Sequence, residues 1–261
     1  MQPLPPSPAE RSARLSFLPE AAWWLFVVWT AIGFVVMPLD IGQATVDHWL
    51  GPGPARSALT AVLHVSDAVW IYLAAVVIYL HTAAAEGLAT ARRWAVIILV
   101  GSGVCEWIGA QTGFPFGPYR YTDYFGWRVG GVLPVAIPLA WLVVLLCGRS
   151  LILRLRPTST RAELALGVAV VATLTDANLE AVAWKVRHYW NWYPDASPPL
   201  PTWPPFQNYF SWFGLSFVLA YALPPNYSLR PRSSSPLRPI LVLALMNTLF
   251  IVVYAARWLR L

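Results

Sequence analysis

The sequence has few charged residues, one lysine, two cysteines and four histidines. Only 11% of its 261 residues are charged, whereas 57% are hydrophobic, and soluble domains carry about 25% charged residues. A chain of this length cannot bury so much apolar surface in a soluble core. The shortage of charge therefore excludes a soluble enzyme and a disordered chain, and it indicates a protein that crosses a membrane several times.

The scarcity of cysteine, histidine and lysine argues against several kinds of site. Cys105 and Cys147 both lie in apolar runs, which argues against a disulfide framework and against a cysteine metal site. The histidines form no closely spaced group of the kind that holds iron in membrane oxygenases. The single lysine, Lys185, lies outside the last apolar run, which excludes a retinal Schiff base of the rhodopsin kind.

Apolar runs that approach the length of a membrane span are the dominant pattern. A bilayer core needs about 20 apolar residues per helix, and the sequence predicts an all-α, polytopic transmembrane helix bundle. The expected spans lie at about 21–39, 60–84, 93–110, 131–153, 162–183, 209–223 and 239–256. The sixth run is short, so six spans plus a re-entrant segment is an alternative. Residues 1–20 are expected to form a Pro-rich polar tail, and residues 21–261 a single transmembrane helical domain.

Basic residues are distributed unevenly between the two sides of the expected bundle. The N-terminal tail and the even-numbered loops hold eleven, and the odd-numbered loops and the C-terminus hold seven. The positive-inside rule then favours a cytoplasmic N-terminus. Because these residues stand singly or in pairs, the net charge of +6 indicates membrane topology and no nucleic-acid partner. Loops one, three and five share one side in either orientation.

Five ionisable side chains lie inside the expected spans, where charge is costly and usually functional. All five fall near the odd-loop face: His64, Asp67, Glu106, Asp176 and Glu180. His64 and Asp67 are three residues apart, and Asp176 and Glu180 are four apart, so each pair shares a helix face. Two carboxyl groups on one face compete for protonation, so that one can hold a proton and act as a general acid. The alternative is that these groups only bond to neighbouring helices.

Aromatic residues gather on the same side as the ionisable ones. Residues 107–127 and 184–213 contain 19 of the 37 Phe, Trp and Tyr residues. Rings that face inward can stabilise a cation through their quadrupole. Loop three (Gln111–Gly130) and the Pro-rich loop five are therefore expected to form a stiff cover over a site. An interfacial aromatic belt is the alternative.

The most specific motif lies between Glu106 and Tyr121, which read EWIG and, two residues later, TGFPFGPYRY. This stretch resembles the integral-membrane carotenoid biosynthesis proteins, which include the bacterial carotenoid 1',2'-hydratases and the archaeal bisanhydrobacterioruberin hydratases. Ser211 departs from the family pattern, which has Gly there. The resemblance continues through Gly131, Pro134, Pro138, Trp141, Asp176, Trp190, Trp192, Pro205, Asn208 and Trp212.

The resemblance implies a substrate and a reaction. The substrate would be a linear carotenoid such as lycopene or γ-carotene, and the reaction would add water to its terminal 1',2' double bond, which gives a tertiary alcohol. The protein would be a cofactor-independent hydro-lyase in the cell membrane of a prokaryote. Its partners would be the carotenoid, water, the lipid bilayer and other carotenoid biosynthesis enzymes. We expect neither a metal nor a cofactor.

Roles for the polar residues follow from this chemistry. We expect Glu106 to be the acid that protonates the alkene, and Asp176 or Glu180 to be the base on the water side, with His64 and Asp67 orienting groups or relaying protons. Substrate contacts are expected from Phe116, Tyr119, Tyr121, Trp190, Trp192, Asn208 and Trp212. Two alternatives remain open: a cyclase or isomerase that loses a proton from the same cation, and a carotenoid- or lipid-binding membrane protein without catalysis.

Overall fold

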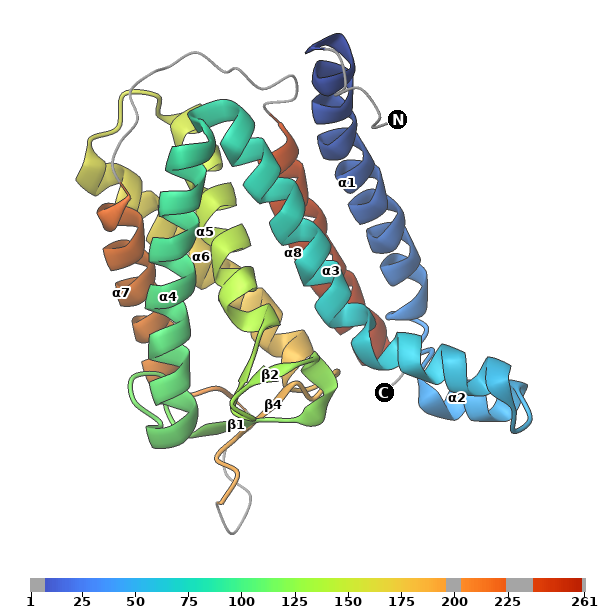
Figure 1. Ribbon diagram of the computed structural model, residues 1–261. Coiled ribbons are helices and arrows are strands. Elements are labelled where there is room, and N and C mark those ends of the chain that lie inside the picture. The colour runs from blue at the N-terminus through green and yellow to red at the C-terminus, as the bar shows by residue number, and fades with distance from the viewer. Residues whose placement is uncertain (1–7, 196–202, 224–236, 260–261) are drawn as a thin grey trace.

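The computed structural model describes residues 8–195, 203–223 and 237–259. Helices make up most of this part of the chain, which confirms the predicted all-α, polytopic bundle (Figure 1). The helices are α1 (Pro8–Val36), α2 (Gln43–Trp49), α3 (Pro54–Glu86), α4 (Leu88–Thr112), α5 (Ala136–Leu155), α6 (Arg161–Ala183), α7 (Phe206–Ala222) and α8 (Arg238–Leu259). The short elements are β1 (Tyr119–Tyr121), η1 (Asp123–Phe125), β2 (Arg128–Val129), β3 (Leu133–Pro134) and β4 (Trp190–Trp192).

Six of the described helices are long and apolar enough to cross a membrane: α1 from Phe17 onward, α3, α4, α5, α6 and α8. The protein is therefore a multi-pass membrane protein. Helix α7 has 17 residues and occupies the place of the short sixth run expected at 209–223. Helix α1 begins at Pro8, inside the segment expected to be a polar tail. The helices run past the apolar stretches because backbone hydrogen bonding continues into the polar flanks.

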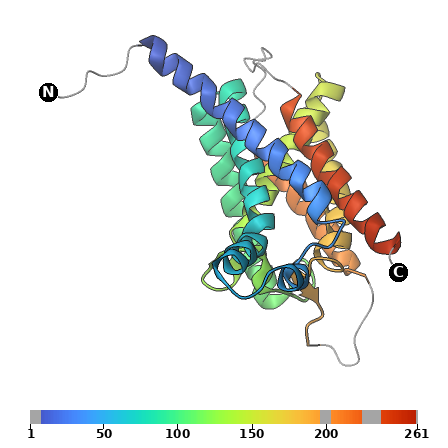
Figure 2. The same ribbon diagram turned by 90° about the vertical axis from the view of Figure 1, so that its right-hand side faces the viewer.

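Helix α5 is the most buried of these spans, and it forms the centre of the bundle. It contacts α3, α4, α6, α7 and α8. Helix α1 lies at the outside of the bundle, where it packs against α3 and α8 and is the least buried of the six spans (Figure 2). The arrangement leaves the walls of a central site to α4, α5, α6 and α7.

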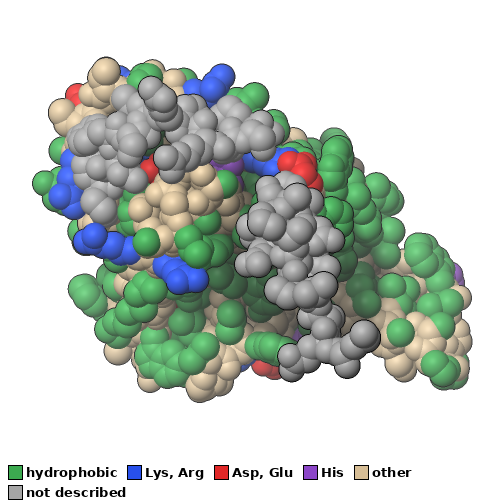
Figure 3. Space-filling model, turned by 45° about the horizontal axis from the view of Figure 1, so that its top comes forward, with side chains coloured by type: hydrophobic (Ala, Val, Ile, Leu, Met, Phe, Trp, Pro, Cys, Tyr) green, Lys and Arg blue, Asp and Glu red, His purple; other side chains and the backbone are tan. Residues whose placement is uncertain are grey.

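The described parts of the loops that join α1 to α3, α4 to α5 and α6 to α7 all lie at one end of the bundle (Figure 1). This end also carries the four strands. Several basic side chains lie at the opposite end (Figure 3), and all of them are arginines, since the single lysine, Lys185, follows α6 at the end with the strands. Exposed Arg92, Arg93, Arg154 and Arg156 lie near the ends of α4 and α5 there. At this same end, Gly87 makes the tight link between α3 and α4 with a positive φ of 90°, which a residue without Cβ adopts easily.

The loops expected to form a proline-stiffened cover contain two small antiparallel sheets. Strand β1 pairs with β4, so that Tyr119 faces Trp192 and Tyr121 faces Trp190. Strand β2 pairs with β3. Part of the expected cover in loop five, residues 196–202, lies outside the described residues. The sheet of β1 and β4 thus joins loop three to loop five across about 70 residues of sequence.

Candidate active site

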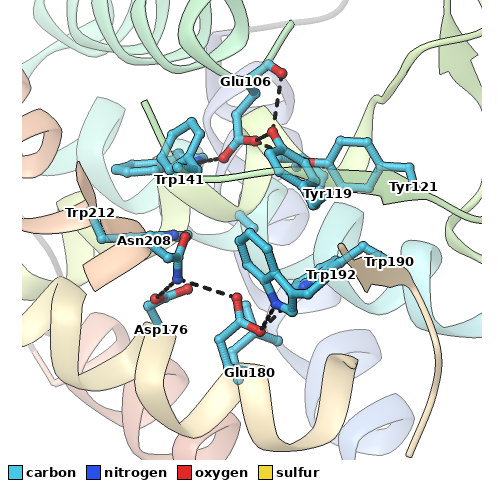
Figure 4. Close-up of a pocket in the computed structure, with 14 residues that line it drawn as sticks. Glu106, Tyr119, Tyr121, Trp141, Asp176, Glu180, Trp190, Trp192, Asn208 and Trp212 are labelled. Carbon is cyan, nitrogen blue, oxygen red and sulfur yellow. Dashed lines mark hydrogen bonds between the residues drawn. The ribbon is translucent and has the colours of Figure 1, made fainter. Parts of the chain in front are cut away.

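A small pocket of about 40 Å³ lies between the helices beneath the β1–β4 sheet (Figure 4). Its walls are almost entirely aromatic and aliphatic, and three carboxyl groups interrupt them. The lining residues are Glu106, Phe116, Tyr119, Tyr121, Ile137, Ala140, Trp141, Asp176, Leu179, Glu180, Trp190, Trp192, Asn208 and Trp212. The pocket therefore brings together three of the five ionisable residues and all seven of the substrate contacts expected from the sequence.

The β1–β4 sheet supplies four of these rings. Side chains alternate between the two faces of a strand, and Tyr119 and Tyr121 of β1 are buried while Arg120 between them is exposed. Trp190 and Trp192 of β4 show the same alternation around Asn191. One face of the sheet therefore closes the pocket with aromatic rings, and its other face carries polar side chains.

Glu106 of α4 is surrounded by hydrogen-bond donors. Its Oε1 accepts from the indole N–H of Trp141 at 2.9 Å. Its Oε2 accepts from the hydroxyls of Tyr119 at 2.7 Å and Tyr121 at 2.8 Å. Burial, followed by the nearby Glu106 carboxylate, raises the pKa of both tyrosine hydroxyls, so both keep their protons and donate. Three donors satisfy this carboxylate in a buried position.

Asp176 and Glu180 of α6 lie one helical turn apart and share a partner on α7. The Asn208 side-chain amide donates to Asp176 Oδ2 at 2.8 Å and to Glu180 Oε1 at 3.3 Å. Glu180 Oε2 also accepts from the indole N–H groups of Trp190 at 3.2 Å and Trp192 at 3.0 Å. Asp176 Oδ1 is buried and has no hydrogen-bond partner in the described part of the chain. The two carboxyl groups therefore differ: Glu180 has three donors and Asp176 has one.

Trp141 of α5 is a pocket residue that was absent from the expected contacts. Its ring stacks on Trp212 of α7, with centroids 3.8 Å apart and planes 10° apart. It is fully buried, and its indole N–H binds Glu106. A buried indole N–H usually finds a hydrogen-bond partner, and this tendency is the signal in the sequence that could have identified Trp141. Trp141 therefore joins one aromatic wall to one carboxylate.

His64 and Asp67 of α3 do not line this pocket. His64 lies on a separate hollow with Arg56, and its ring is 5.9 Å from that of Tyr124. Asp67 accepts hydrogen bonds from Arg187 and Tyr189 and borders a larger apolar cavity of about 230 Å³ between α1, α3 and α8. The structure therefore separates these two side chains from the three clustered carboxyl groups.

No group of three His, Cys, Asp or Glu side chains within residues 8–195, 203–223 and 237–259 has the geometry of a metal site. The three pocket carboxyl groups instead bind tyrosine hydroxyls, indole N–H groups and an amide. Each of these partners donates a hydrogen bond to a carboxyl oxygen, which can accept it whether the carboxyl group is charged or neutral. The described polar groups thus suit proton chemistry on an apolar ligand.

Gly109 of α4 provides a test of how closely the pocket is packed. A Cβ on Gly109 would lie 2.8 Å from Phe116 Cδ2 and 2.9 Å from the Tyr119 hydroxyl. We expect Gly109→Ala to lower stability by about 1–3 kcal/mol, the usual cost of overpacking, measured as thermal unfolding of the purified protein. The matched control is Gly103→Ala on the same helix, whose Cβ would meet Pro138 at an ordinary 3.6 Å. Equal unfolding temperatures for the two variants would contradict the close packing.

Comparison with known sequences finds one family whose members resemble the chain. The sequence profile of the carotenoid biosynthesis proteins matches residues 66–260, which is about three quarters of the chain. The matched region runs from α3 to α8 and includes every residue that lines the pocket. No curated protein and no solved structure shows significant similarity to the chain.

Proposed function

The chain belongs to the carotenoid biosynthesis protein family, and from this premise we propose that it is a carotenoid hydratase. It adds water to the terminal 1',2' double bond of a linear carotenoid such as lycopene or γ-carotene. The product is a tertiary alcohol. We further propose that the protein acts in the plasma membrane of a prokaryote, where its substrate is dissolved in the bilayer.

The observation that carries this proposal is the free oxygen of a buried carboxyl group in a pocket of aromatic rings. Asp176 Oδ1 has no partner among the described residues, although the side chain is 1% exposed. The indole N–H groups of tryptophan can only donate, so Glu106 Oε1 and Glu180 Oε2 must accept. Asp176 Oδ1 is therefore the oxygen that can hold a proton without losing a hydrogen bond. Asp176 is therefore the acid in this proposal, in place of Glu106, the acid expected from the sequence.

The proposed reaction has two steps. Asp176 first gives its proton to the less substituted alkene carbon, so the π electrons form a C–H bond and a tertiary cation remains. A water oxygen then forms a bond to that cation, and the proton that it releases goes to Glu180. Both carboxyl groups line the pocket, which has room for water, so a water molecule between them can return the proton to Asp176. General acid–base catalysis of this kind contributes about 10²–10⁴-fold to a rate.

The pocket walls stabilise the cation in two ways. Each desolvated aromatic face contributes up to about 2 kcal/mol, and the stacked Trp141 and Trp212 present such faces together with the rings of the sheet. Glu106 supplies a negative charge. Its three donors reduce its nucleophilicity, so that it attracts the cation without forming an ester. Glu106 thus acts as a fixed counter-charge in this proposal.

The size of the pocket sets a condition on substrate binding. A volume of about 40 Å³ admits water, whereas a cavity that binds benzene measures about 150 Å³. The branched end of a carotenoid therefore needs the lining rings to move apart. The rest of the polyene remains in the hydrocarbon core, whose thickness of about 30 Å the extended molecule nearly matches.

Expression in a bacterium that accumulates lycopene tests the proposal. We expect new pigments heavier than lycopene by one or two molecules of water, detected by mass spectrometry of the extracted carotenoids. A pigment of unchanged mass but altered chromatographic mobility would instead identify a cyclase or isomerase. Unaltered lycopene in cells that contain the protein in their membranes would favour a binding protein.

A further inference from the structure

We infer that Asp67 is a positioning residue, which holds the β1–β4 sheet in place over the pocket through Arg187 and Tyr189. Only the expected effect of Asp67 on the rate of hydration rests on the proposed function. The sheet carries four pocket rings, whereas Asp67 itself lies outside the lining. Its role is therefore to act through other residues and not on the substrate.

The contacts of Asp67 connect α3 to the segment between α6 and β4. Asp67 Oδ2 accepts from Arg187 Nε at 2.9 Å and from the Tyr189 hydroxyl at 2.6 Å, and it forms an ion pair with Arg187. The side chain of Asp67 is 12% exposed, so solvent screens this ion pair weakly. Burial, followed by the Asp67 carboxylate, raises the pKa of the Tyr189 hydroxyl, which therefore keeps its proton and donates. This carboxylate thus holds two residues of the connecting segment, Arg187 and Tyr189.

Tyr189 transmits this anchoring to the sheet. Its ring stacks on Phe125, with centroids 4.3 Å apart. Its backbone carbonyl accepts from the Thr122 N–H at 2.9 Å, directly after β1, and its N–H donates to Ala183 O at the end of α6. The hydroxyl, the carbonyl and the N–H of Tyr189 therefore form hydrogen bonds with three different parts of the fold. Trp190, the next residue, begins β4.

The position of Trp190 and Trp192 determines the environment of Glu180. Both indoles donate to Glu180 Oε2, and the backbone of β4 also sets the register of Tyr119 and Tyr121 on β1. These tyrosines in turn donate to Glu106. A shift of β4 would therefore disturb two of the three pocket carboxyl groups at once. Asp67 on α3 opposes such a shift through its hydrogen bonds with Arg187 and Tyr189.

The Asp67→Asn variant tests this role. It keeps the shape of the side chain but leaves the Arg187 charge without its carboxylate, which favours movement of the segment away from α3. We expect amide hydrogen exchange of residues 118–125 and 187–193 to become at least about tenfold faster, measured by mass spectrometry on the purified protein. In the hydration assay we expect kcat to fall about tenfold or more with little change in KM.

Two further variants separate positioning from a direct chemical part. Replacing both partners, as in Asp67→Asn with Arg187→Gln, removes the uncompensated charge, so slow exchange and part of the kcat should return. A proton relay through Asp67 predicts no recovery of kcat in this double variant. The matched control is Asp47→Asn, which removes the carboxylate of another aspartate–arginine ion pair, with Arg56, and should change neither quantity.

The outcomes keep this inference separate from the proposed function. Unchanged exchange in the sheet of Asp67→Asn would overturn the positioning role, whatever the enzyme does. If the wild-type protein forms no hydrated product, the proposed function fails, while the exchange result still decides the role of Asp67. Should Asp67→Asn not accumulate, Tyr189→Phe removes one hydrogen bond and keeps both charges. Faster sheet exchange in that variant supports the inference, and unchanged exchange overturns it.

Discussion

The Asp176→Asn variant is expected to accumulate in the membrane and to form hydrated carotenoid about 10³-fold more slowly than the wild type, or not at all. Asparagine has nearly the same shape but has no acidic proton to give to the alkene. Asn208 donates to Oδ2, so the new amide NH₂ can take the place of the protonated Oδ1. That O–H also lacks a partner among the described residues, so the exchange adds no newly unpaired donor and should cost little stability. The measurement is the initial rate of product formation per amount of protein, together with thermal unfolding.

Asp123→Asn is the matched control for this variant. Asp123 lies on the same end of the protein, and its side chain is 94% exposed in an ion pair with Arg128. Exposed ion pairs contribute little to stability, so this variant should keep wild-type activity. If Asp176→Asn retained more than about a tenth of the wild-type rate, a loss too small for a missing general acid, Asp176 could not be the acid.

Glu106→Gln is expected to lose stability as well as activity, which distinguishes it from Asp176→Asn. If the new amide NH₂ faces Trp141, it meets an indole N–H that can only donate. If it faces Tyr119 and Tyr121, a hydroxyl oxygen can accept from it, but the two hydroxyl protons lose Oε2 as their acceptor. A buried donor without an acceptor costs about 1–3 kcal/mol. Loss of the negative charge also removes the counter-charge for the cation, so product formation should fall at least about a hundredfold.

Thermal unfolding in detergent measures the loss of stability of Glu106→Gln, and product analysis in membranes measures its loss of activity. Glu163→Gln is the control, because Glu163 belongs to the capping box with Thr160 at the start of α6, more than three helical turns before Asp176, and does not line the pocket. It should leave product formation unchanged. A Glu106→Gln protein as stable and as active as the wild type would refute the assigned role of Glu106.

The helices of this protein were predictable because a bilayer imposes a strong and local requirement. Runs of about 20 apolar residues locate α3, α4, α5, α6 and α8, with each end within six residues of the observed one. The ends are less predictable, since a helix continues into polar sequence where its backbone hydrogen bonds are satisfied. The first helix begins at Pro8 for this reason, and the short run at 209–223 became a 17-residue helix.

The sequence predicts the depth of the candidate residues in the membrane well, but it predicts less well the direction in which their side chains point. Each residue of a helix rises 1.5 Å, so positions along the spans indicate that Asp67, Glu106 and Asp176 lie at similar depth. The rotation of each helix about its axis depends on packing against neighbours. Helix α3 turns Asp67 toward Arg187 and away from the pocket, which the sequence alone does not reveal.

The β1–β4 sheet illustrates what local patterns cannot specify. Each strand has three residues, too few for a reliable periodic signal. The alternations Tyr119-Arg-Tyr121 and Trp190-Asn-Trp192 agree with strands that expose one face, but nothing local indicates that these segments pair. That pairing is what directs four rings onto one pocket.

Isotope labelling of the product tests the central claim, that a buried carboxyl group protonates the alkene and water then adds to the cation. Purified protein in lipid nanodiscs would be incubated with lycopene in water enriched in ¹⁸O, and the product analysed by mass spectrometry. The account predicts that every new hydroxyl carries ¹⁸O from the solvent. A hydroxyl that takes its oxygen from O₂, or a product without added oxygen, would contradict it.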